Sequence, residues 1–305
     1  MDVVRLPIVC GPTGAGKSRL ALALAEASGS TIVSADSRQI YRRFDIGTAK
    51  PSVEEQARIP HACIDIVEPG ERYSAARWVH HASAAIDRCL DARIPPVVVG
   101  GTGFYLRALV APLFAEPSLD PAQRQALARD LDRLSTEELR RKCRDVDPAR
   151  AHLGRTQLLR AIEVALLSGE RISTLHVYAA RDARYSARYL LVDPGPVLAD
   201  LIAARVDAML AHGWIDEVRH LVRDIPPDAP AWNATGYGLI RQVVTGALGL
   251  TEARERIIIA TRQYAKRQRT WFRHQLPAHD VVRVNSAAPD ALDVALAWWR
   301  EEEQA

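Results

Sequence analysis

A glycine-rich run near the start of the chain constrains the fold most strongly. The run Gly11-Pro12-Thr13-Gly14-Ala15-Gly16-Lys17-Ser18 follows the apolar segment Leu6–Cys10 and precedes a helical pattern over Arg19–Ala27. It matches G-x-x-x-x-G-K-[ST], the phosphate-binding loop, in the strand–loop–helix setting that this motif requires. Backbone N–H groups, the Lys17 ammonium and the helix N-terminus would hold a polyphosphate, and the Ser18 hydroxyl would contact Mg²⁺. The pattern predicts polyphosphate binding but not what becomes of the polyphosphate.

Short apolar runs rich in β-branched residues alternate with helical patterns along the chain. The runs are Leu6–Cys10, Thr31–Ser34, Pro96–Gly100, Tyr189–Val192 and Val281–Val284. The helical patterns between them include Arg19–Ala27 and Ser74–Ala92. This alternation predicts an α/β fold with a parallel, doubly wound sheet. Because such sheets bind ligands beyond the carboxyl ends of their strands, the loops after Cys10, Ser34 and Gly100 should meet at one site.

The alternation stops between about residues 116 and 184, where only helical patterns remain. Pro121–Leu134 begins with a proline suited to the first helical turn, and Ser135-Thr136-Glu137-Glu138 is a capping-box signature that opens the next helix. A further helix is predicted over Thr156–Leu167. We therefore expect a helical domain over residues 116–184, inserted into a core of residues 1–115 and 185–305 with a helical C-terminal part.

Composition narrows the class of protein. The chain has 305 residues, of which 48% are hydrophobic and 25% charged, values typical of a soluble globular protein. Its apolar runs are too short to span a membrane, and a strand begins too near the N-terminus for a signal peptide. The four cysteines are scattered, which predicts free thiols in the cytoplasm rather than disulfides or a zinc site. The net charge of +3 does not by itself indicate nucleic-acid binding.

Polar residues also follow two other predicted strands. Asp36 lies just beyond Thr31–Ser34, where a carboxylate can bind Mg²⁺, accept a proton or cap a helix. The turn Gly100–Tyr105 places three glycines around Thr102, which either presents its hydroxyl to a ligand or only forms a tight strand–helix turn. Taken alone, Lys50 would be a solvated surface lysine, and Arg219 an ordinary arginine on a helix surface.

A basic helical pattern covers Arg262–Arg273. At roughly 100° per residue, four cations fall within about a 60° sector: Arg262, Lys266, Arg269 and Arg273. Tyr264 and Trp271 lie on the opposite face, which should dock on the protein. Such a stripe is usually a solvated face, but no acidic residue falls between Ile257 and Leu276 to pair with it. This favours contact with an anion, for which a nucleic-acid backbone is the natural candidate.

These segments resemble the bacterial tRNA dimethylallyltransferases, also called tRNA isopentenyltransferases, from about Leu6 to about Arg273. The specific motifs are D-S-x-Q-x-Y…I-G-T-A-K-P at Asp36–Pro51, G-G-T-x-x-Y at Gly100–Tyr105 and A-K-R-Q-x-T-W-x-R at Ala265–Arg273. The resemblance implies a P-loop NTPase/kinase-like core with a helical insertion. It also implies transfer of a dimethylallyl group from dimethylallyl diphosphate to N6 of adenosine 37 in the anticodon stem-loop of tRNA, with Mg²⁺ as cofactor, by a protein expected to be a monomer.

The resemblance also implies roles for individual residues. Lys17, Ser18, the rest of the Gly11–Ser18 loop and Arg219 would hold the diphosphate, with Ser18 on the metal. Asp36 would be the general base, with Thr102 near the reacting centre. Contacts with tRNA would come from Asp36, Ser37, Arg38, Gln39, Thr102, Arg124, Thr156, Gln157, Leu158, Leu159, Arg160, Asn233, Gly236, Tyr237, Lys266, Arg267, Arg269 and Arg273.

Two other functions remain open from the sequence. An adenylate isopentenyltransferase or a small-molecule kinase would share the phosphate loop, although neither needs the helical insertion or the basic stripe. An RNA-binding switch driven by nucleoside triphosphate would need no prenyl donor. The sequence shows no clear Walker-B aspartate after an apolar strand, which argues against such a switch.

Overall fold

The computed structural model describes residues 3–111, 117, 119–178 and 183–303. The chain divides into two compact units. The first comprises residues 1–110 and 184–305, and the second comprises residues 111–183. The second unit contains the helices that the sequence predicts for an insertion.

The first unit is built on a parallel sheet of six strands in the order β3-β2-β4-β1-β5-β6. The strands are β1 (Val4–Cys10), β2 (Thr31–Ser34), β3 (His61–Ala62), β4 (Pro96–Gly100), β5 (Tyr185–Val192) and β6 (Val281–Val284). In the middle of the sheet, Ile8 pairs with Val98 and with Tyr189. All five predicted strands are confirmed. Strand β3 was missed because two residues carry no periodic pattern.

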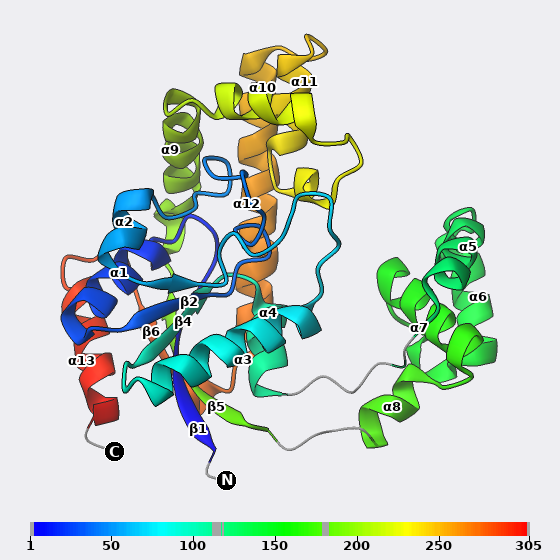
Figure 1. The fold of residues 1–305 in the computed structure, drawn as a ribbon, viewed down its shortest axis with the longest axis horizontal. Coiled ribbons are helices and arrows are strands. Elements are labelled where there is room, and N and C mark those ends of the chain that lie inside the picture. Colours follow the sequence, from blue (N-terminus) through cyan, green and yellow to red (C-terminus); the bar gives the residue numbers. More distant parts are fainter. Residues whose placement is uncertain (1–2, 112–116, 118, 179–182, 304–305) are drawn as a thin grey trace. The chain divides into compact units, whose positions relative to one another are not determined.

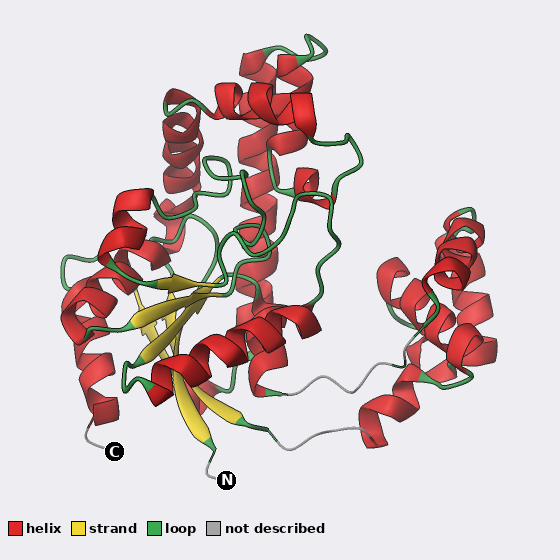
Figure 2. Ribbon diagram, in the orientation of Figure 1, coloured by secondary structure: helices red, strands yellow, loops and turns green. Residues whose placement is uncertain are grey.

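Helices cover both faces of the sheet (Figure 1, Figure 2). Helices α1 (Lys17–Ser28) and α13 (Ala291–Glu303) pack together on one side, and α3 (Ala75–Asp91) with α4 (Gly103–Val110) on the other. The short α2 (Val53–Arg58) lies in the loop after β2. This is the P-loop-like α/β arrangement that the resemblance implies.

A helical region continues from the sheet toward the C-terminus. It contains α9 (Leu198–Ala211), α10 (Trp214–Asp224), α11 (Tyr237–Val244) and α12 (Leu250–Gln275). Its aromatic core joins Trp214 and Tyr237 to Phe44 in the loop after β2. Helix α12 contacts α9, α11 and α4, so it runs from this region to the edge of the sheet (Figure 1). The predicted helix over residues 262–273 is the last part of α12.

The second unit consists of α5 (Pro121–Asp132), α6 (Thr136–Val146), α7 (Arg155–Ser168) and α8 (Ile172–Tyr178). Ser135 and Glu138 form the predicted capping box at the start of α6. The core of this unit buries Leu139, Cys143 and Ile162. Cys10, Cys63, Cys89 and Cys143 are buried free thiols, as the sequence predicts. Within the described residues, no helix combines the length and apolar character needed to cross a membrane.

Candidate active site

The glycine-rich loop connects β1 to α1 at the carboxyl edge of the sheet. Gly14 and Gly16 have φ values of +79° and +81°, a conformation that other residues adopt only with strain. A Cβ atom at Gly11 would come within 2.2 Å of the Val192 carbonyl oxygen. Helix α1 begins at Lys17, so its free N–H groups follow the loop directly. A helix N-terminus of this kind attracts anions.

Two cations face the loop from different helices. The Lys17 ammonium donates a hydrogen bond of 2.8 Å to the Pro12 carbonyl oxygen. Burial of this ammonium, together with repulsion from Arg205, lowers the pKa of Lys17 to about 8, while Asp36 opposes the shift. Burial also lowers the pKa of Arg205, again opposed by Asp36. Two cations and one carboxylate that line the same cavity form a site suited to a multiply charged anion.

Arg205 on α9 lines this cavity together with Arg38, whereas Arg219 does not. Arg219 lies on α10 with 53% of its side chain exposed, forms an ion pair with Asp216 and lies outside the residues that line the cavity. The assignment of Arg219 to the diphosphate stays a prediction, which the lining of the described cavity does not favour. The signal for Arg205 was present in the sequence, because Ile202, Arg205 and Met209 share one face of α9, and a lone arginine on an apolar face suggests a buried role.

Asp36 follows β2 and is bound at one of its carboxylate oxygens. Its Oδ1 accepts hydrogen bonds from the N–H groups of Arg38, at 2.8 Å, and Gln39, at 3.4 Å. Within the described residues, Oδ2 has no hydrogen bond. The helix-cap interpretation is wrong, because residues 37–40 form a turn and no helix begins there; Oδ1 instead holds that turn, and the other oxygen is free to bind a substrate or accept a proton.

Thr102 connects the loop after β4 to the loop after β2. Its N–H donates to the Ala35 carbonyl oxygen at 3.2 Å, and its Oγ1 accepts the N–H of Ser37 at 3.1 Å. Gly100 allows this close approach, since a Cβ there would lie 2.2 Å from the Ala35 oxygen. Thr102 is therefore held beside Asp36.

A cavity of about 390 Å³ opens beyond the carboxyl ends of the strands. Its polar wall includes Thr13, Lys17, Ser18, Asp36, Arg38, Gly101 and Arg205. Its apolar wall includes Ile202, Val206, Met209, Trp214 and Ile257. Residues from the loops after Cys10, Ser34 and Gly100 all line it, which confirms that these loops meet. One cavity thus combines cations, a carboxylate and an apolar surface.

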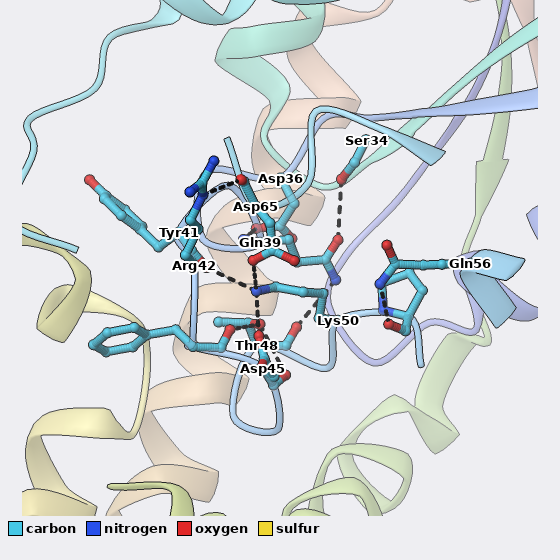
Figure 3. A network of polar contacts seen from close by, with 12 residues as sticks. Ser34, Asp36, Gln39, Tyr41, Arg42, Asp45, Thr48, Lys50, Gln56 and Asp65 are labelled. Carbon is cyan, nitrogen blue, oxygen red and sulfur yellow. Dashed lines mark hydrogen bonds and ion pairs between the residues drawn. The ribbon is translucent and has the colours of Figure 1, made fainter. Parts of the chain in front are cut away.

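Lys50 is a buried ion-pair partner and not the solvated surface lysine expected from its position (Figure 3). Only 3% of its side chain is exposed, and it pairs with Asp45 and Asp65 while donating 2.9 Å to the Tyr41 carbonyl oxygen. Sequence reasoning missed this because Asp65 lies on a separate turn. The Lys50 pairs fix the shape of the loop that carries Asp36.

Gln39 has its side-chain amide engaged within the same loop (Figure 3). Its Nε2 donates to the carbonyl oxygens of Ala49, at 2.9 Å, and Thr48, at 3.3 Å, while its Oε1 accepts from the Ser34 hydroxyl. The amide serves to hold the loop, while Gln39 also lines the cavity, and contact of its segment with an extruded adenosine stays a prediction. Ser37 and Arg38 remain partly exposed beside it, and Arg38 lines the cavity.

The residues predicted to contact RNA around the start of α11 also include both buried and exposed side chains. Tyr237 is fully buried, and its hydroxyl donates to Glu217 at 2.6 Å and accepts the N–H of Gly47 at 3.1 Å. Gly236 packs against Trp214, from which a Cβ would lie 2.3 Å away. Tyr237 supports the loop from inside and is not exposed to RNA, so its predicted contact is corrected, whereas Gly236 is partly exposed. Asn233 is exposed.

The basic stripe on α12 is only partly available to an external anion. Arg269 donates to Asp193 through Nε at 2.9 Å and to the Gly195 carbonyl oxygen at 2.6 Å, so its predicted RNA contact is corrected. The missing acidic partner comes from the loop after β5, which no local sequence window includes. Lys266, Arg267 and Arg273 are exposed and form no ion pair within the described residues.

In the second unit, one residue predicted to contact RNA lies in the hydrophobic core. Leu158 is fully buried in the unit's hydrophobic core and is therefore corrected. Leu159 is half-buried and packs against the same core. Arg124 and Arg160 both form ion pairs with Glu163. Thr156 and Gln157 are exposed at the start of α7.

A parallel sheet whose first strand runs into a glycine-rich anion loop, with a carboxylate opposite that loop, defines a P-loop-like α/β protein with an enzyme-like cavity. The sequence profile described as IPP transferase matches residues 39–275, and that described as isopentenyl transferase matches residues 4–64. The chain belongs to the IPP transferase family.

Individual relatives agree with this assignment. The chain is 42% identical over 290 residues to a tRNA dimethylallyltransferase from Anaeromyxobacter sp. (strain K), covering 91% of this chain and 95% of the relative. A protein of the same name from Thermus thermophilus is 39% identical, with 88% and 90% covered. The crystal structure of a tRNA isopentenylpyrophosphate transferase from Staphylococcus epidermidis matches with a TM-score of 0.69 and 30% identity, covering 99% of both chains.

Proposed function

We propose that this chain transfers the dimethylallyl group of dimethylallyl diphosphate to N6 of adenosine 37 in tRNA, giving N6-isopentenyladenosine and diphosphate. Family membership supports the reaction class, since relatives at about 40% identity carry the name tRNA dimethylallyltransferase. The single observation that carries the proposal is the cavity that Lys17, Arg205 and Asp36 line together. We also propose that the protein acts as a cytoplasmic monomer.

The cations act on the leaving group. As the bond between C1 of the prenyl group and the diphosphate oxygen breaks, its electron pair passes to that oxygen and negative charge grows there. The Lys17 ammonium, the Arg205 guanidinium and the N–H groups at the start of α1 stabilise this charge. Because both cations are partly buried beside the cavity, their attraction for the diphosphate is stronger than that of exposed side chains. The apolar wall of the cavity suits the prenyl group.

Asp36 acts on the nucleophile. The N6 amine of adenine is weakly nucleophilic because its lone pair is delocalised into the ring. As N6 bonds to C1, its proton passes to the free Oδ2 of Asp36, while Oδ1 remains bound to the loop. Thr102, held against Ser37, orients the base beside this carboxylate. Adenosine must leave its stack to reach the cavity, and this is less costly in a loop, where the base is already unpaired.

Mg²⁺ is the expected cofactor, and the residues present fit a shared site. The described residues hold no cluster of three or more carboxylate, histidine or cysteine ligands. Mg²⁺ is commonly bound by one or two protein groups, substrate phosphates and water. The Ser18 hydroxyl lines the cavity next to the loop and would supply one such ligand. When bound there, the ion would neutralise diphosphate charge.

The tRNA would be held mainly through its backbone. On the first unit, the exposed cations Lys266, Arg267 and Arg273 of α12 are suited to phosphates. On the second unit, Thr156 and Gln157 at the start of α7, together with Arg124 and Arg160, form the proposed contact surface. Arg38 beside Asp36 would contact the extruded nucleotide.

Competing acceptors test the proposal. The purified protein would be incubated with radiolabelled dimethylallyl diphosphate and either unmodified tRNA or AMP. We expect label on tRNA alone. Label on AMP alone would identify an adenylate isopentenyltransferase, and hydrolysis of nucleoside triphosphate without any labelled acceptor would contradict prenyl transfer altogether.

A further inference from the structure

Gln268 of α12 bridges the two loops that would hold the two substrates. Its Oε1 accepts the N–H of Thr13 at 2.8 Å, and its Nε2 donates to the Gly101 carbonyl oxygen at 2.7 Å. The partners fix the orientation of the amide, because one is a donor and the other an acceptor. Only 7% of Gln268 is exposed. One side chain therefore joins the glycine-rich loop to the turn that carries Thr102.

The glycines of that turn make room for α12. A Cβ at Gly101 would lie 2.5 Å from Nε2 of Gln268, and a Cβ at Gly103 would lie 2.3 Å from the ring of Trp271. Gln268 and Trp271 are three residues apart and so lie on neighbouring parts of one helix face. The turn is thus shaped to receive these two side chains, a use of its glycines separate from ligand contact.

The bridge also decides which backbone groups can meet the diphosphate. The N–H of Thr13 is held by Gln268, so the anion must be bound by later N–H groups of the loop and by Lys17. From Gly101 the chain continues to Thr102, whose hydroxyl accepts the N–H of Ser37 beside Asp36. A continuous series of bonds therefore runs from the diphosphate loop to the proposed general base.

We propose that Gln268 is a positioning residue that fixes the diphosphate loop relative to the Thr102 turn. The prenyl donor and the tRNA acceptor are thereby aligned for transfer. This inference rests on the proposed function. Gln268 would not touch either reacting atom. Its contribution is to hold both loops in one geometry before the substrates arrive.

Replacement of Gln268 by glutamate removes one of the two hydrogen bonds of the bridge and keeps the other. In Gln268→Glu the ionised carboxylate still accepts the Thr13 N–H but cannot donate to the Gly101 oxygen. We expect kcat to fall about tenfold, as for loss of a buried hydrogen bond. The KM for tRNA should stay unchanged and the KM for dimethylallyl diphosphate should rise. Because the protonated carboxyl can donate again, the ratio of variant to wild-type kcat should rise as the pH is lowered.

Gln263→Glu is the matched control. Gln263 lies on an exposed part of the same helix, so this variant adds the same charge without touching the bridge. It should show wild-type constants at every pH. Gln268→Met removes both bonds at similar volume and should show a deficit that does not recover at low pH. The positioning role is wrong if Gln268→Glu behaves like Gln263→Glu, or if its deficit is independent of pH.

Two further measurements separate the possible failures. If thermal unfolding shows that Gln268→Glu does not fold, Gly101→Ala breaks the same bridge from the other side, and a normal kcat in that variant would overturn the inference. If the wild-type protein transfers no prenyl group, the proposed function fails on its own account. Calorimetric binding of inorganic pyrophosphate then still reports the bridge, with weaker binding in Gln268→Glu than in Gln263→Glu expected, and equal binding contradicting it.

Discussion

The cavity and the exposed face of α12 both carry cations, but in opposite settings. Lys17 and Arg205 line the cavity together with Asp36, and burial lowers the pKa of each. Lys266 and Arg273 lie in solvent, while Arg269 between them is already bound to Asp193. Because Lys17 and Arg205 are partly buried, they are suited to binding a single anion at one defined position. The exposed cations can only supply additive attraction to an extended backbone.

The largest effect is expected from substitution of Asp36, the carboxylate that lines the cavity together with the two cations. Asp36→Asn keeps the shape of the side chain and the Oδ1 bonds that hold the turn but removes proton acceptance, so prenyl transfer should fall at least ~10²-fold. Binding of tRNA should be retained. Single-turnover transfer and filter binding would measure the two quantities. A near wild-type transfer rate in this variant would end the assignment of Asp36 as general base.

Substitutions of Arg205 and Arg219 compare a cation in the cavity with a cation on the surface. Arg205→Gln removes a charge-assisted contact with the diphosphate, so affinity for inorganic pyrophosphate should fall by about 10- to 100-fold. Arg219→Gln removes only an exposed ion pair and should change affinity by less than about twofold. Calorimetry on both variants checks the pair of values. Equal losses in the two would contradict the placement of the leaving group beside Arg205.

The pH dependence of anion binding follows from the cavity cations. Diphosphate requires the charged form of Lys17, whose pKa lies at about 8, so affinity for pyrophosphate should fall as the pH rises through that value. Arg205→Gln removes repulsion and should raise the midpoint, whereas Asp36→Asn removes attraction and should lower it. Titration of pyrophosphate itself is common to all variants and cancels. Midpoints that do not move in either variant would contradict the coupling.

The smallest effects belong to the exposed face of α12. Lys266→Ala combined with Arg273→Ala should weaken tRNA binding and reduce the slope of log affinity against log salt by about 1 for each cation removed. Binding measured at several salt concentrations gives the slope. Arg269→Ala should instead lower the melting temperature, because it breaks the pairing with Asp193. An unchanged slope in the double variant would make the stripe a solvated face.

Features set by local sequence were predictable. The glycine-rich loop, the five longer strands and the capping box at Ser135 each depend on neighbouring residues, and the structure contains all of them. The meeting of three loops was also predictable, because parallel strands place their carboxyl ends along one edge.

Features set by distant partners were not predictable from local patterns. Lys50 pairs with Asp65 from another turn, and Arg269 is bound by Asp193 from the loop after β5. Tyr237 and Leu158 belong to hydrophobic cores that only the folded chain assembles. Arg205 shares a face of α9 with apolar residues, which is visible in the sequence, but the cavity beside that face is formed by segments that only the folded chain brings together.

Mass analysis of nucleosides tests the central claim most directly. Unmodified tRNA would be incubated with the purified protein, Mg²⁺ and dimethylallyl diphosphate, then digested to nucleosides, with the Asp36→Asn protein in parallel. The account predicts N6-isopentenyladenosine, located beside the anticodon, in the wild-type sample and almost none in the variant. Adenosine left unmodified by the wild-type protein would contradict the account.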